Sequence, residues 1–329
     1  MKKIGVLLIL MSALAWAQEP ADQTPEEAPS PHVAKVGSAE AVTHPVEPMQ
    51  KPTYQDIYCA GFVTRDHVSH SSFVAGGIAS PDTTKFVTGE VVYLSGAHWN
   101  MGDRITFVRD LTDPNRYEPF QGQHALLAAT GQPYSELGQA RVVDTRSKMA
   151  IASIDFSCEP IVPGDLAVPF IEREKISFRS PQQFDRFAPR NASVVGRIVM
   201  ARDFDEVLGT RSKVYLTVGS SKGVKPGDYF RITRTYAADL TDPMESQSFK
   251  ASTTEDTQKN TPVVNSPFGH GKHPVIHVKD MPRRAVGELI VLNVTPTSAT
   301  GMITFALEDV RVGDDVELEP AAPTTASVQ

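Results

Sequence analysis

The feature that most constrains the fold of this chain is an internal repeat. Residues 137–165 align without a gap with residues 286–314, and a shorter match upstream pairs 92–94 with 214–216. The shared positions of the long segments are Gly138 and Gly287, Ala150 and Ala299, Ile154 and Ile303, Phe156 and Phe305, Glu159 and Glu308, and Gly164-Asp165 and Gly313-Asp314. A repeat of this length indicates a duplicated structural unit. Because the shared residues are of turn and core types, the repeat favours a scaffold over an enzyme.

Short runs of alternating apolar and polar residues make up each copy, as in 214–218, 229–233 and 289–294. β-branched and aromatic residues predominate in these runs, and Gly, Pro, Asp and Ser separate them, which is the pattern of β-strands. Only 124–130 shows a trace of helical periodicity. A unit of about five to six strands removes its exposed edges most easily by closing on itself. The chain is therefore expected to be all-β, with two tandem, duplicated, SH3-like β-barrels.

Composition sets the boundaries of the parts. A signal peptide is expected at 1–17, a disordered Pro-, Glu- and Ala-rich linker at 18–53, and the first β-module at 54–170. A connector at 171–189 leads to the second β-module at 190–318, which carries a loop insertion at 236–283, and 319–329 forms a disordered tail. The connector contains Phe178, Phe184 and Phe187. Because leaving three aromatic rings in water is unfavourable, the two modules are expected to pack together.

The N-terminus carries the marks of export. Lys2 and Lys3 precede an apolar run, and Ala15-Trp16-Ala17 supplies the small residues before a cut at Gln18. This is the layout of a secretory signal peptide, although retention as an N-terminal anchor is the alternative. No other stretch is apolar enough to span a bilayer, so no transmembrane span is expected in the mature chain.

The charge balance bears on the kind of partner. Cleavage removes two of the 32 Lys and Arg residues and none of the 39 Asp and Glu residues, so the formal charge changes from −7 to about −9. An acidic chain argues against nucleic acid as the main partner, because nucleic-acid binding needs a basic surface. The segment 18–52 contains seven prolines and no aromatic residue. It cannot bury enough apolar surface to fold, so we expect a flexible tether or a simple tail.

Four Gly-Asp pairs stand where strands are expected to begin. Glycine permits the positive φ of a tight turn, and an aspartate can accept hydrogen bonds from the turn backbone. The aspartates concerned are Asp103, Asp165, Asp228 and Asp314. A catalytic carboxylate dyad is the alternative, but no partner base recurs beside these residues. Turn chemistry is the preferred interpretation.

The two cysteines, Cys59 and Cys158, both lie in the first module. The first strand of each copy is expected at 58–63 and 194–199, which aligns Cys59 with an apolar residue, just as Cys158 aligns with Leu307. This pattern suggests two positions that touch in the barrel core, and adjacent thiols of an exported protein are expected to join. We therefore predict a disulfide that closes a loop of about 100 residues. Two separate buried thiols are the alternative.

Three histidines, His270, His273 and His277, lie within eight residues and could ligate zinc or copper. Their spacing matches no known zinc finger, so a solvated loop is preferred. The sequence also contains no phosphate-binding loop and no nucleophile elbow. It therefore predicts no catalytic residue, no metal and no cofactor.

Trp99 is the single tryptophan of the mature chain and the one candidate recognition residue. Its ring either covers the end of a barrel or stacks on a sugar or a protein partner. An exposed groove shared by Trp99, Tyr58 and Phe73 would favour a glycan site.

Several phrases of the sequence resemble those of known envelope proteins. VYLTVGSSKGVKPGDYFRITR, VGELIVLNVTPTSATGMITF and VRVGDDVEL resemble the C-terminal β-domain of the flagellar assembly protein T family. The chain also resembles uncharacterised exported cell-envelope proteins of acidobacterial type, which often carry LysM peptidoglycan-binding domains. Their similar phrases correspond to Tyr58–Phe62, Phe156–Cys158 and Phe184–Pro189 of this chain. The likeness covers about 54–318 but includes no LysM-like segment, and it implies no catalytic residues.

These observations predict a non-enzymatic exported protein of the cell envelope, in the periplasm or at the outer membrane, that acts as a structural or interaction scaffold. Its partners would be envelope proteins or cell-wall glycan. A peptidoglycan- or polysaccharide-binding protein is the alternative function, and a hydrolase is the least favoured.

Overall fold

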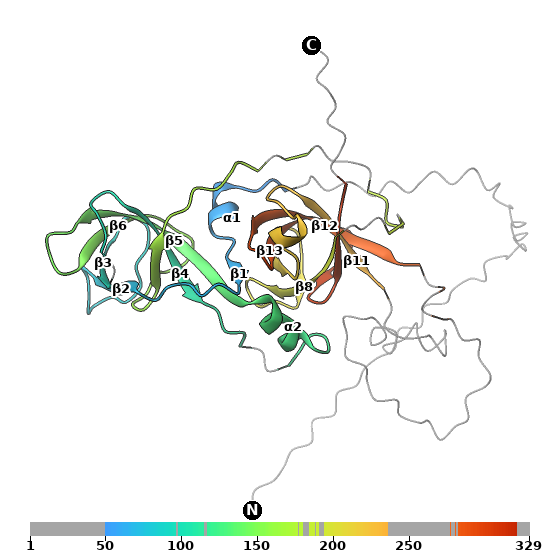
Figure 1. Cartoon of the computed structure of the whole chain (residues 1–329), viewed down its shortest axis with the longest axis horizontal. Coiled ribbons are helices and arrows are strands. Elements are labelled where there is room, and N and C mark those ends of the chain that lie inside the picture. Colours follow the sequence, from blue (N-terminus) through green and yellow to red (C-terminus); the bar gives the residue numbers. More distant parts are fainter. Residues whose placement is uncertain are drawn as a thin grey trace, which may run out of the picture. The chain divides into compact units, whose positions relative to one another are not determined.

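The structure is a computed structural model. It describes residues 50–96, 98–114, 117–176, 178–179, 184–187, 189–190, 194–235, 277, 280 and 282–320. All of these residues belong to one compact unit, Glu47–Gln329. Two β-barrels dominate it, one formed by the blue-to-green strands and the other by the yellow-to-red strands of Figure 1.

The first barrel is a closed ring of six antiparallel strands in the order β5-β4-β7-β2-β3-β6, in which β5 and β6 also pair. These strands are β2 (Ser72–Gly77), β3 (Val91–Gly96), β4 (Arg104–Asp110), β5 (Gln132–Asp144), β6 (Ala150–Ser157) and β7 (Leu166–Pro169). A short strand, β1 (Phe62–Thr64), pairs with the first residues of β5. Two helices accompany the ring, α1 (Tyr54–Tyr58) and α2 (Gln123–Thr130). The second coincides with the segment whose sequence has helical periodicity.

The second barrel closes in the order β10-β13-β12-β11-β15-β8. Its strands are β8 (Val195–Ala201), β10 (Lys213–Leu216), β11 (Tyr229–Arg234), β12 (Arg284–Val294), β13 (Ala299–Ala306) and β15 (Asp315–Leu318). A small two-stranded sheet joins β9 (Val207–Leu208) to β14 (Val310–Arg311), and a 3₁₀ turn, η1, spans Ser220–Lys222. The predicted insertion at 236–283 falls between β11 and β12, and most of it lies outside the described residues.

The two rings share strand order and register. Thr106 pairs with Gln139, and the equivalent Arg231 pairs with Glu288. Gln139 then pairs with Phe156 as Glu288 pairs with Phe305. Outside the rings, the isolated bridge between Phe86 and Ile161 occupies the place of the β9–β14 pair. The predicted all-β fold with two duplicated barrels is confirmed.

One alignment made from the sequence is wrong. The strand of the first barrel that is equivalent to β8 is β2. It lies between β7 and β3, just as β8 lies between β15 and β10. Residues 58–63, which were expected to match 194–199, instead contain the end of α1 and the start of β1. Their alternating pattern indicates an extended, half-buried segment, but it does not specify which surface covers that segment.

Each ring encloses an apolar core. In the first it includes Val74, Leu94, Ile105, Phe107 and Ile154, and in the second Ile198, Leu216, Phe230, Val291 and Ile303. The repeated glycines mark a close approach of neighbouring strands. A Cβ on Gly138 would lie 2.4 Å from the carbonyl oxygen of Phe156, and a Cβ on Gly287 would lie 2.6 Å from that of Phe305. No side chain fits at either position without moving the backbone.

Candidate functional site: the joint between the barrels

The four repeated aspartates are bound in turns. Each accepts a hydrogen bond from the backbone N–H three residues earlier, at 2.8 Å for Asp103, 2.7 Å for Asp165, 2.8 Å for Asp228 and 2.8 Å for Asp314. The glycine before each has a positive φ between 91° and 108°. A strand begins at the residue that follows each pair, in β4, β7, β11 and β15. The expectation that these pairs serve as turns is supported by this geometry.

Two of the four aspartates also bind an arginine of the same barrel. Arg109 donates from Nε and Nη2 to the carboxylate of Asp165 at 2.7 and 2.8 Å. In the second barrel, Arg234 makes the same pair of bonds to Asp314 at 2.8 and 2.7 Å. Each guanidinium also donates to a backbone carbonyl, that of Pro160 or Asp309. We call this arrangement the Arg–Asp clamp.

The arginines of the clamp were not among the residues predicted from the sequence, although both copies carry them at the same position. Counting from the aligned Gly102 and Gly227, Arg109 falls on Arg234, seven residues further along in both copies. Arg109 and Arg234 are not sequence neighbours of Asp165 and Asp314, so looking for a basic residue next to each aspartate does not find them. The partner comes from a neighbouring strand, because β4 pairs with β7 and β11 with β15.

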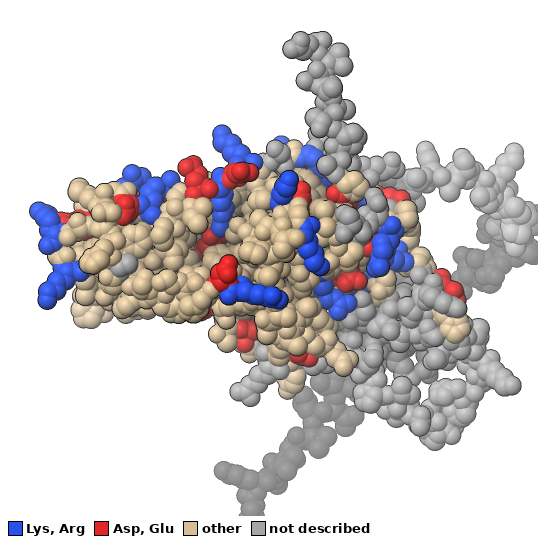
Figure 2. All heavy atoms as spheres, viewed as in Figure 1, with Lys and Arg blue, Asp and Glu red and all other residues tan. Residues whose placement is uncertain are grey.

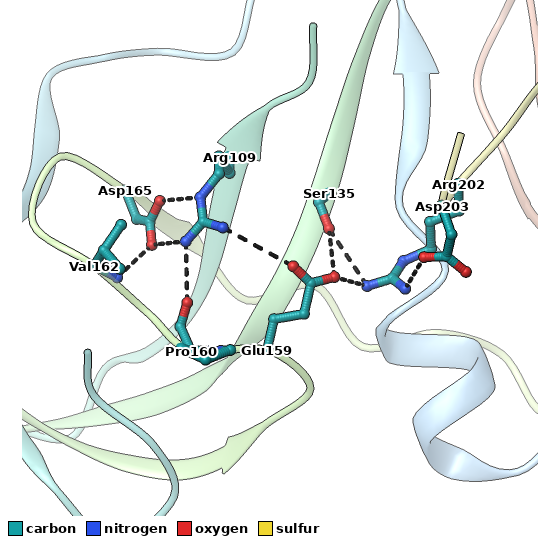
Figure 3. Close-up of polar contacts among 8 residues, drawn as sticks. All are labelled: Arg109, Ser135, Glu159, Pro160, Val162, Asp165, Arg202 and Asp203. Atoms are coloured by element: carbon teal, nitrogen blue, oxygen red, sulfur yellow. Dashed lines mark hydrogen bonds and ion pairs between the residues drawn. The ribbon is translucent and has the colours of Figure 1, made fainter. Parts of the chain in front are cut away.

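In the first barrel the clamp continues into a chain of charges that reaches the second barrel (Figure 3). Glu159 lies 3.9 Å from Arg109 and is also hydrogen-bonded by Arg202, which follows β8. Ser135 of β5 donates to the same carboxylate at 3.4 Å, and Arg202 pairs in turn with Asp203 at 3.0 Å. Alternating charges thus connect a turn of one barrel with the edge of the other.

The short helix α1 provides a second connection. Thr53 and Asp56 form a capping box at its N-terminus, which fixes the Asp56 carboxylate. Arg211 and Lys213 of the second barrel approach that carboxylate at 2.9 and 3.0 Å. Burial acts to raise the pKa of Asp56, but the hydrogen bonds from Thr53 and the charge of Lys213 outweigh it, so this pKa lies below its ordinary value.

Residues 60–63 lie against the outer face of the second barrel. Hydroxyl groups of that barrel donate to their carbonyls: Thr300 to Gly61 at 2.9 Å, and Thr295 to Val63 at 2.8 Å. Gly61 has a φ of +69°, and a Cβ there would lie 2.4 Å from the phenolic oxygen of Tyr215. Only glycine therefore fits at this point of closest approach.

The disulfide fixes the same segment to the first barrel. Cys59, the C-cap of α1, is bonded to Cys158, which follows β6, with the two Cα atoms 6.1 Å apart. The predicted Cys59–Cys158 bond is confirmed, but its place differs from the prediction. It joins a segment outside the ring to the ring, instead of linking two core positions. Segment 54–64, which we call the wedge, is thus covalently attached to one barrel and hydrogen-bonded to the other.

A buried ion pair anchors the wedge to the connector as well. Glu136 of β5 accepts hydrogen bonds from Arg173 and from the backbone N–H of Gly61, the latter at 3.1 Å. Burial raises the pKa of Glu136, and the positive charge of Arg173 opposes that rise. Arg173 also donates to the carbonyl of Ile57. Each carboxylate oxygen of Glu136 therefore accepts one of these hydrogen bonds, Oε1 from Arg173 and Oε2 from Gly61.

Trp99 lies between β3 and β4 of the first barrel and is partly buried. Its ring packs against that barrel's core, and its indole N–H donates to the hydroxyl of Ser72 at 2.9 Å. Tyr58 instead stacks on Phe170, and the backbone N–H of Arg173 donates to its hydroxyl. No contact among the described residues brings Trp99, Tyr58 and Phe73 together in one groove.

The connector phenylalanines have three different surroundings. Phe178 and Phe184 make edge contacts with Tyr229 and Phe305 of the second barrel, whereas Phe187 is exposed. The barrels do pack together, but through the wedge, α2 and the Glu159–Arg202 pair. Of the candidate metal ligands, His270 and His273 lie outside the described residues and His277 is exposed. Within the described part of the chain no group of three metal-ligating side chains converges.

Charges of both signs are interspersed on the face shown in Figure 2, between larger areas of uncharged residues. Among the described residues, no helix is both long and apolar enough to span a bilayer. In the comparisons with known proteins, neither a family model nor a curated protein matches this chain.

Proposed function

We propose that this chain is a non-enzymatic protein of the cell envelope that presents binding surfaces on two rigidly joined β-barrels. The observation that carries the proposal is the wedge. It is disulfide-bonded to one barrel and hydrogen-bonded to the other through Gly61 and Val63. A joint built in this way holds two surfaces at a fixed separation, which is what a scaffold requires.

The use of the polar residues supports the same proposal. The aspartates that recur in both barrels are engaged by turn N–H groups and, in two cases, by a guanidinium. Groups held this firmly in place by neutralising partners suit structure better than proton transfer. The signal-peptide layout of 1–17 and the disulfide are both consistent with export to an oxidising compartment.

The position of Trp99 gives the glycan alternative less support. A sugar-binding platform needs an aromatic face open to solvent, and the ring of Trp99 packs on the barrel core with its N–H bonded to Ser72. We therefore expect binding to protein partners and not to the cell wall.

The test compares two binding assays on the mature full-length chain. Purified sacculi are incubated with the chain and sedimented, and in parallel the chain is crosslinked in intact envelopes and its partners are identified. The proposal expects a reproducible protein partner and no sedimentation with sacculi. Sedimentation with sacculi that is lost in Trp99→Ala would overturn it in favour of glycan binding. The N-terminus of the exported chain, determined by mass spectrometry, is expected at Gln18.

A further inference from the structure

The two barrels allow equivalent outer faces to be compared. In the second barrel, the outer face of β11, β12 and β15 is net acidic: Glu288, Glu317 and Glu319, the last just after β15, surround Arg231, which pairs with Glu319 at 3.3 Å. Described connector residues, among them Arg179, contact it as the side chains of a bound peptide would. Arg179 pairs with Glu288 and Glu319, its backbone N–H donates to the hydroxyl of Tyr229 at 3.0 Å, and its guanidinium lies 4.0 Å from the centre of that ring.

Aromatic contacts complete this intramolecular docking. Phe178 meets Tyr229 edge-on at 6.4 Å between ring centres, and Phe184 meets Phe305 at 5.4 Å. The backbone joins in as well, because Ala285 of β12 donates to the carbonyl of Arg186 at 2.8 Å. This barrel face therefore holds a segment whose arginines and aromatic rings match its carboxylates and its own rings.

The equivalent face of the first barrel keeps the aromatic residue and inverts the charge. Phe156 stands at the position of Phe305, but the positions of the three glutamates carry Gln139, Val168 and Phe170, and that of Arg231 carries Thr106. Arg104 and Arg141 stand at the positions of Tyr229 and Ile290, and they lie opposite each other on the neighbouring strands β4 and β5. One acidic side chain, Asp155, lies 3.8 Å from Arg141. The face of the first barrel is therefore net basic, whereas the equivalent face of the second barrel is net acidic.

This face is only partly covered. Tyr54 of α1 packs edge-on against Phe156 at 5.7 Å and donates to Gln139, yet its side chain remains 52 % exposed. Arg104 is exposed and lies 3.7 Å from the centre of the Phe170 ring, and the adjoining Ile171 is 77 % exposed. Beneath them, Gln139 is only 5 % exposed, and its amide Nε2 has no hydrogen-bond partner among the described residues.

We propose that the patch formed by Tyr54, Arg104, Gln139, Phe170 and Ile171 binds an extended peptide of an envelope partner in which an acidic side chain stands next to aromatic or other large apolar residues. The carboxylate would pair with Arg104, and rotation of the Tyr54 ring would bring the unpaired amide of Gln139 within its reach. Tyrosine and arginine are the residue types that carry most binding energy at protein interfaces. The inference rests on the proposed scaffold function and names the chemistry of its partner.

The probe is derived from the connector itself. One fluorescently labelled peptide has the sequence of residues 174–187, and a second has the same sequence with Arg179→Glu and Arg186→Glu. Binding of both to the full mature chain is followed by fluorescence polarisation. The charge-inverted peptide is expected to bind about tenfold more tightly, because like charges facing each other weaken association.

Two variants of equal charge change test the location. Arg104→Glu is expected to reverse the preference between the two peptides. Arg146→Glu, at a side chain that is 91 % exposed on the β5–β6 turn, is expected to leave it unchanged. The proposal is overturned if neither peptide binds at about 1 mM, if both bind equally, or if the two variants weaken binding alike. Binding of sacculi that is lost in Tyr54→Ala would overturn it too, since the occupant would then be a glycan.

The outcome can be separated from that of the proposed function. If crosslinked envelope partners persist in Arg104→Glu, this patch is not their binding site and the scaffold function stands. If the charge-inverted peptide binds as expected but no envelope protein crosslinks to the chain, the patch is real and the scaffold function fails.

Discussion

At the scale of single residues, the repeat preserves the chemistry of turns. The Arg–Asp clamp occurs in both barrels with the same atoms, but its two copies differ in burial. The side chains of Arg234 and Asp314 are 1 % and 0 % exposed, whereas Arg109 and Asp165 are 34 % and 3 % exposed. Removing one charge of a fully buried pair leaves the other uncompensated, and this costs more than the loss of a pair that water can reach.

This difference gives a matched pair of mutations. Asp314→Asn is expected to lower the free energy of unfolding by about 3–5 kcal/mol. Asp165→Asn is expected to cost less, about 1–2 kcal/mol, since Arg109 is partly solvated and keeps Glu159 at 3.9 Å. Urea unfolding followed by circular dichroism measures both. Equal costs would show that burial does not distinguish the two clamps.

Asp56 makes the free energy of unfolding depend on pH in the acidic range. Its pKa in the folded chain lies below the ordinary value of 3.8, so the stability that it contributes is complete above that value. It is lost as the pH falls through the folded-state pKa. Asp56→Asn is expected to cost about 1–3 kcal/mol at pH 7 and progressively less below about pH 4. Unfolding curves between pH 2 and pH 7 provide the measurement, and a constant difference across that range would contradict the assignment.

At the scale of elements, the sequence predicted what local patterns determine. The strands that follow the Gly-Asp pairs and the pairing of the two cysteines were recognisable from residue types and the repeat, whereas α2 lies where the sequence shows only a trace of helical periodicity. The wedge was not recognisable. Its residues alternate like those of a ring strand, and the surface that buries them belongs to a barrel formed more than 130 residues later. Such a contact leaves no local signature.

The disulfide connects the wedge to the first barrel, so its removal is expected to destabilise the joint. Cys59 and Cys158 are 99 residues apart, and opening a loop of that size costs about 3–5 kcal/mol in the chain-entropy model. The Cys59→Ala/Cys158→Ala variant is therefore expected to unfold at lower urea concentration than the oxidised wild type. The wild type under a reducing agent serves as the control and should behave like the variant. Equal midpoints for the oxidised and reduced chains would contradict a structural role for the bond.

At the scale of the whole molecule, the duplication sets the two-barrel architecture, and the two copies differ in the side chains of their outer faces. The two barrels could be predicted from the sequence, because the repeat reports a duplicated unit directly, whereas the export signal at 1–17 stays a prediction. The sequence did not predict the candidate binding patch, since only the pairing of β4 with β5 and β7 shows that Arg104, Gln139 and Phe170 share one outer face. The second barrel uses its acidic face on the connector, and the first keeps an inverted face partly open.

If the wedge joins the two barrels into one body, they should unfold together, which differential scanning calorimetry measures. The oxidised wild type is expected to unfold in a single transition whose calorimetric and van't Hoff enthalpies agree. In Gly61→Val, even the Cβ would lie 2.4 Å from the Tyr215 hydroxyl oxygen, so the wedge cannot keep its contact with the second barrel. This variant should unfold in two transitions, one for each barrel. Two independent transitions in the wild type, or a Gly61→Val chain that unfolds like the wild type, would contradict the claim.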